Sequence, residues 1–153
     1  MRSTFRPLFV FSLVLLGACG PRNTPPVAPE AVPARIAAHK QLWDARRPAD
    51  YRVTFSRSCF CVGPRGPVVM EVRGGRIASA KYAEGGAAIP SEEWSHLLTV
   101  DGVFERIAEG LRNGQTVAAE YHPTLGYPTS AEVGTLANDA GTRYTLSELE
   151  PLR

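Results

Sequence analysis

Apolar and polar residues alternate in several short segments of the chain, which is typical of strands with one buried face. In the segment 51–56, Tyr51, Val53 and Phe55 alternate with polar residues, and the segment 68–72 alternates in the same way. Gly74-Gly75 is a two-residue hairpin signal that leads into a further strand at 76–82. Three more strands are expected at residues 116–121, 128–134 and 142–149.

Two other segments have helical spacing. After Pro33, Ile36, Leu42 and Trp43 are spaced for one face of a helix, which Pro48 ends. A second helix is expected to begin with Asp101 as its N-cap and to end at Gly114. Its apolar stripe consists of Val103, Phe104, Ile107, Ala108 and Leu111.

The order of these elements is helix, three strands, helix, three strands. Residues 83–98, between the third strand and the second helix, are predicted to be irregular, with one helical turn near Glu92 to Leu97. Because short links between adjacent strands favour antiparallel pairing, we predict an α+β fold. Its antiparallel sheet should have about six strands and carry both helices on one face.

The N-terminal residues have a different pattern. Arg2 and Arg6 precede an apolar run that is too short to span a bilayer, which is typical of a secretory signal peptide. Leu16-Gly17-Ala18-Cys19 follows and resembles the lipobox of bacterial lipoproteins. The resemblance implies cleavage after residue 18 and modification of Cys19 with a diacylglyceryl thioether and an N-acyl chain, typically palmitate. The alternative is an ordinary secreted protein with a chance cysteine at this position.

Three parts are therefore expected in the chain: a signal peptide at 1–18, a lipidated cysteine with a tether at 19–33, and a single domain at 34–153. The stretch 20–33 contains five prolines, which favour a semi-rigid extended spacer. By resemblance to bacterial sorting rules, Gly20 in place of Asp favours the outer membrane. We expect a lipid-anchored envelope protein that faces the periplasm.

Charge excludes one class of partner. The full chain has 17 Lys+Arg and 15 Asp+Glu. Removal of the signal peptide takes away two arginines and no acid, which leaves 15 residues of each sign. We expect no nucleic-acid partner, because the mature chain is not basic and has no clustered stripe of Lys and Arg.

Cys59 and Cys61 flank Phe60 just before a turn rich in Gly and Pro. Residues i and i+2 of an extended strand lie about 6.5–7 Å apart, near the upper limit for a disulfide, so a bond requires a bend at Phe60. Three interpretations stay open: a local structural disulfide, a redox-active pair, or a thiolate site for Cu(I) or Zn. Two free, buried thiols are a further alternative. A closed zinc site needs four ligands, and none of the three histidines has ligand spacing to another, so we expect no bound metal.

The segment 121–130 is a second candidate region. Tyr121, His122 and Tyr127, together with Phe60, are our candidate binding surface. The alternative, which a loop fixed by two prolines and a glycine favours, is a rigid connection whose tyrosines pack into the core or cover its edge. Ser130, His122 and Asp139 are the residue types of a triad, but no nucleophile-elbow motif frames Ser130. We therefore expect no catalytic residue, no cofactor and no enzyme activity.

The domain is similar to the bacterial DUF6174 family of exported proteins, whose function is uncharacterised. The similarity covers roughly residues 40–148 and implies no activity. It rests on Tyr51-Arg52-Val53-Thr54-Phe55, Ser58-Cys59-Phe60-Cys61, Val72-Arg73-Gly74-Gly75-Arg76-Ile77, Thr99-Val100-Asp101-Gly102-Val103-Phe104-Glu105-Arg106-Ile107 and Gly126-Tyr127-Pro128-Thr129-Ser130.

Two functions are expected from these observations. The first is a non-catalytic binding or structural domain, held at the membrane through Cys19, with an envelope protein as its candidate partner. The alternative is a thiol-based redox or metal-binding protein that uses Cys59 and Cys61.

Overall fold

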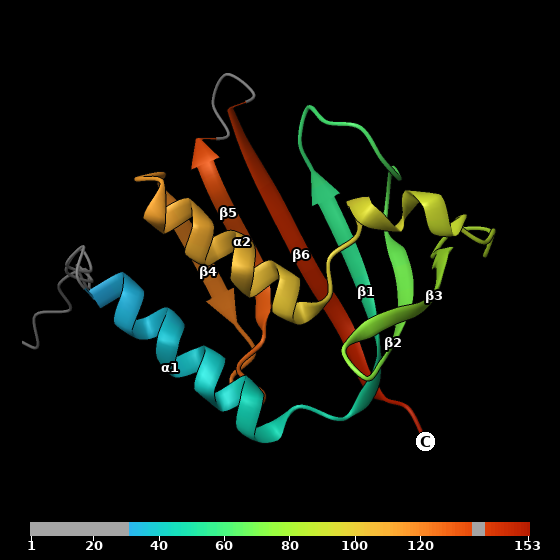
Figure 1. Cartoon of the computed structure of the whole chain (residues 1–153), viewed down its shortest axis with the longest axis horizontal. Coiled ribbons are helices and arrows are strands. Elements are labelled where there is room, and N and C mark those ends of the chain that lie inside the picture. The colour runs from blue at the N-terminus through green and yellow to red at the C-terminus, as the bar shows by residue number, and fades with distance from the viewer. Residues whose placement is uncertain (1–30, 136–139) are drawn as a thin grey trace, which may run out of the picture.

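The computed structural model describes residues 31–135 and 140–153 (Figure 1). The expected signal peptide, Cys19 and most of the tether lie outside the described residues, as does Asp139. The helices are α1 (Ala31–Arg46), the 3-10 helix η1 (Ser91–His96) and α2 (Val100–Arg112). The strands are β1 (Asp50–Ser58), β2 (Val68–Arg73), β3 (Arg76–Tyr82), β4 (Val117–Tyr121), β5 (Pro128–Thr135) and β6 (Ala140–Pro151).

The six strands form one antiparallel sheet in the order β3-β2-β1-β6-β5-β4. Each half of the sheet comes from one run of three consecutive strands, and the pairing of β1 with β6 joins the halves. Both helices lie on the same side of the sheet, where α2 crosses β5 and β4 (Figure 1). The predicted α+β fold and its element order are confirmed.

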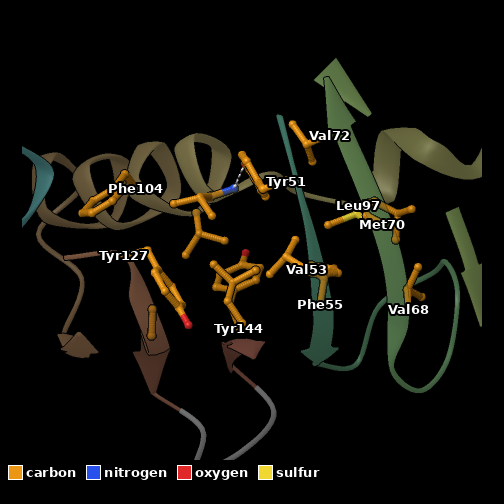
Figure 2. Close-up of a cluster of buried hydrophobic side chains, with 14 of the residues drawn as sticks. Tyr51, Val53, Phe55, Val68, Met70, Val72, Leu97, Phe104, Tyr127 and Tyr144 are labelled. Carbon is orange, nitrogen blue, oxygen red and sulfur yellow. Dashed lines mark hydrogen bonds between the residues drawn. The ribbon is translucent and has the colours of Figure 1, made fainter. Parts of the chain in front are cut away.

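One face of the sheet forms the core, because alternate residues of its strands point toward the helices. Val53, Phe55 and Met70 point into this layer from β1 and β2 (Figure 2). Tyr51 of β1 reaches the start of α2, where its hydroxyl accepts a hydrogen bond from the Val100 N–H at 3.4 Å. The apolar stripe predicted on the second helix is confirmed, because Val103, Phe104 and Ile107 are buried there.

The other face of the sheet is polar. Arg52 pairs with Glu71 across β1 and β2 at 3.1 Å, and the Thr54 hydroxyl donates to Glu148 at 2.8 Å. These groups are substantially exposed, so the pairs add little to stability. No described helix is long and apolar enough to cross a membrane.

Two predicted boundaries need correction. Helix α1 begins at Ala31, before Pro33, because a proline in the first turn of a helix loses no helical hydrogen bond. The N-cap of α2 is Thr99, whose hydroxyl accepts from the Gly102 N–H at 3.2 Å. Asp101 lies inside the first turn and instead pairs with Arg47 at 2.8 Å, which links α2 to the end of α1.

Candidate functional site

The loop between β1 and β2 (residues 59–67, hereafter the β1–β2 loop) begins with the two cysteines. Strand β1 ends at Ser58, and the chain then bends from Cys59 to Gly63. The Cα atoms of Cys59 and Cys61 are 5.3 Å apart and their sulfur atoms are at disulfide distance. The bend expected at Phe60 is therefore present, and it brings the pair closer than an extended strand allows.

Two further interactions fix the shape of this loop. The Arg57 guanidinium donates a hydrogen bond to the Val62 carbonyl and so ties the end of β1 to the loop. Gly63 has φ +127°, and a Cβ there would lie 2.8 Å from the Cβ of His96 in η1. Only glycine fits this backbone and this contact. The close approach of the two cysteines and the contact with η1 therefore both shape the loop.

This fixed loop projects apolar side chains into solvent. Phe60 is 91% exposed and Val62 is 80% exposed. They are the exposed large hydrophobic residues of the described part of the chain. Large apolar side chains are more often buried, so these two make the loop a candidate contact surface.

A recess of about 390 Å³ lies beside the loop. The two cysteines and Phe60 form one wall, the C-terminal half of α2 forms another, and residues of β5 and β6 complete the lining. Arg106 and Glu109 of α2 line the recess and pair with each other at 2.8 Å. Sequence reasoning missed these two residues, because their spacing on α2 is that of an ordinary solvated ion pair.

Glu109 is the carboxylate among the described residues that line the recess. It pairs with Arg106 at the exposed surface of α2. Within the described residues, no group of three or more His, Cys, Asp or Glu side chains is placed to hold a metal ion.

The structure separates Phe60 from the other candidate binding residues. Strand β4 runs antiparallel to β1, so the end of β4 at Tyr121 lies at the opposite end of the sheet from the end of β1 (Figure 1). His122 and Tyr127 belong to the turn that follows β4. The four residues therefore do not form one surface, and the β1–β2 loop includes only Phe60.

The turn after β4 packs against the core. Tyr127 is 5% exposed and meets Trp43 of α1 edge to face, with ring centroids 6.0 Å apart. His122 stacks on Tyr127 at 4.9 Å, and its Nδ1 accepts backbone N–H bonds from Thr124 and Leu125. With Nδ1 as an acceptor, the side chain of His122 fixes the turn from within rather than facing a ligand.

An aromatic cluster lies where α1 meets β4, and sequence reasoning did not find it. His39 of α1 stacks on Tyr121 with ring centroids 4.0 Å apart. Burial raises the pKa of Tyr121 to about 12, and burial followed by the nearby Arg35 lowers the pKa of His39. His39 Nδ1, Trp43 Nε1 and the Tyr121 hydroxyl are buried without a hydrogen-bond partner.

A shallow apolar groove of about 580 Å³ runs between α1 and α2. Ile36, Phe104 and Leu111 line it, with Lys40 and Arg112 among its polar residues. The sequence predicted the apolar faces of both helices, but it did not predict that a groove lies between them.

Comparison with known proteins gives a family and no activity. The model of a family of unknown function, DUF6174, matches residues 35–151. The chain belongs to the DUF6174 family. No curated protein and no solved structure matches it.

Proposed function

We propose that this DUF6174 protein is a lipid-anchored component of the bacterial cell envelope whose domain binds without catalysis through the β1–β2 loop. One observation carries the proposal, namely the 91% exposure of Phe60 on a loop closed by the Cys59–Cys61 pair. A loop whose backbone is already constrained loses little backbone entropy on binding, so a small apolar contact is used efficiently.

The lipobox-like Cys19 supports the anchored part of the proposal. Two or more acyl chains on one residue hold a protein firmly at a bilayer, whereas one chain holds it only marginally. We expect the intact mass of the mature protein to begin at residue 19 and to include the lipid. The Cys19→Ala variant should leave the membrane fraction. Recovery of an unmodified Cys19 from a membrane-bound wild type would contradict this part.

The binding part is tested by photo-crosslinking in cells. A photoreactive phenylalanine analogue is placed at Phe60 and, as a matched control, at Arg76. Both positions are exposed, but Arg76 follows the β2–β3 hairpin at the opposite end of the sheet from the β1–β2 loop. We expect adducts from position 60, with lipid or with protein, that position 76 does not give. The same adduct pattern at both positions would count against the β1–β2 loop as the binding surface.

Thiol chemistry is the second candidate function, and the exposure of Cys61 favours it. Arg57 and Arg65 line the same small hollow as the two cysteines, and nearby cations stabilise a thiolate. Mass spectrometry after rapid alkylation of cells separates the two candidates. A mixture of alkylated and bonded Cys59 and Cys61 would support a redox cycle. A fully bonded pair with no bound metal would favour the structural role.

A further inference from the structure

We propose that the β1–β2 loop is a second membrane contact, in which Phe60 and Val62 enter the interface of an anionic phospholipid bilayer. This inference rests on the proposed function, because it names the surface that the loop binds. Three observations support it: the small size of the apolar tip formed by Phe60 and Val62, the arginines beside this tip, and the length of the tether.

The apolar tip is small. A specific protein interface covers about 800 Å² on each partner, whereas one exposed aromatic side chain offers roughly 200 Å². Phe60 and Val62 are also the exposed large hydrophobic residues of the described chain, so the apolar tip consists of two side chains. A bilayer interface accepts such a tip without needing a complementary pocket.

Cationic groups flank the tip. Arg65 lines a hollow with Phe60 and Val62, and Arg57 lines the neighbouring hollow with Arg65. No carboxylate is among the described residues that line these two hollows. Arginine binds phosphate oxygens with its planar fork, so this combination fits phospholipid headgroups around an inserted aromatic ring.

The tether permits this contact. Eleven residues lie between Cys19 and Ala31, and an extended chain of that length reaches at most about 40 Å. A domain of this size has a radius of gyration of about 14 Å, so the loop can reach the bilayer that holds the lipid. Because the anchor keeps the domain at a high effective concentration near the surface, a weak contact suffices.

Fluorescence quenching by brominated lipids tests this inference on the full-length lipidated protein. The protein is reconstituted into phosphatidylethanolamine and phosphatidylglycerol vesicles, some of which carry bromine on the acyl chains close to the headgroup. Phe60→Trp reports the loop, and Arg76→Trp is the matched exposed control. The signals of Trp43 and Trp94 are subtracted using the wild type. We expect bromine to lower the fluorescence from position 60 at least about twofold and to leave position 76 unchanged.

The outcomes separate this inference from the proposed function. An unquenched tryptophan at position 60 in a protein whose mass shows lipid on Cys19 would overturn the membrane contact alone. Absence of that lipid would overturn the anchored function itself. Replacing phosphatidylglycerol by phosphatidylcholine should reduce quenching at position 60, as should Arg65→Gln. Unchanged quenching in both cases would overturn the role assigned to the arginines.

Discussion

The imidazole of His39 lies flat against the phenol ring of Tyr121, with the two planes 5° from parallel. His39 is on α1 and Tyr121 ends β4, so this stack fastens the first helix to an edge strand of the sheet. Burial is the main cause that lowers the pKa of His39 from 6.5, and Arg35 adds to it. The native contact therefore favours the neutral imidazole.

Stability should fall on acidification because of this histidine. A pKa that is lower in the folded state means that the unfolded chain binds the proton more readily. The contribution of His39 is fully present above its unfolded pKa and is lost as the pH falls through the folded value. Urea unfolding of the wild type and of His39→Phe from about pH 7.5 to about pH 5 isolates this effect. The variant should have the flatter profile, and parallel profiles would contradict the prediction.

Gly126 should be much less replaceable than Gly75. Both have positive φ, +79° and +77°, but a Cβ at Gly126 would lie 2.6 Å from the His39 carbonyl oxygen, whereas Gly75 faces open space. We expect Gly75→Ala to cost about 1 kcal/mol from backbone strain alone. Gly126→Ala should cost more than about 2 kcal/mol, because α1 must also move. Equal free energies of unfolding for the two variants would show that α1 can shift away from Gly126 at no cost.

Truncation of Phe55 should lower the free energy of unfolding far more than truncation of Phe60. Phe55 is 2% exposed in the core, and Phe60 is 91% exposed on the β1–β2 loop. Phe55→Ala should lower the free energy of unfolding by about 3–5 kcal/mol. Phe60→Ala should change it by less than about 0.5 kcal/mol. A large loss at Phe60 in denaturant unfolding would mean that its ring packs against the domain.

Removal of the Cys59–Cys61 bond should cost little stability. The two cysteines are separated by two positions in sequence, so the bond closes a very short loop. The chain-entropy relation then gives about 1.6 kcal/mol for Cys59→Ser combined with Cys61→Ser. Denaturant unfolding with and without reductant gives the same quantity for the wild type. A loss above about 3 kcal/mol would show that the pair supports the core as well as the loop.

The type and order of the elements were predictable from the sequence. Alternation at Tyr51, Val53 and Phe55 and the Gly74-Gly75 turn are local signals, and strands and hairpins form from local geometry. Helix boundaries were less predictable, because Thr99 and Asp101 are both acceptable N-caps in isolation. In the structure Thr99 caps the helix, and the Val100 N–H that follows it donates to the Tyr51 hydroxyl of β1.

Only the tertiary structure decided which candidate residues face solvent and which lie together. Phe60 and Tyr127 have similar aromatic character in the sequence, yet Phe60 is exposed and Tyr127 is buried under Trp43. The pairing of β1 with β6 and the docking of α1 place them at opposite ends of the sheet. The alternation of apolar and polar residues along a strand shows only which of its side chains share the buried face. The order of the strands and the surface left open depend on contacts between distant segments, which no local pattern contains.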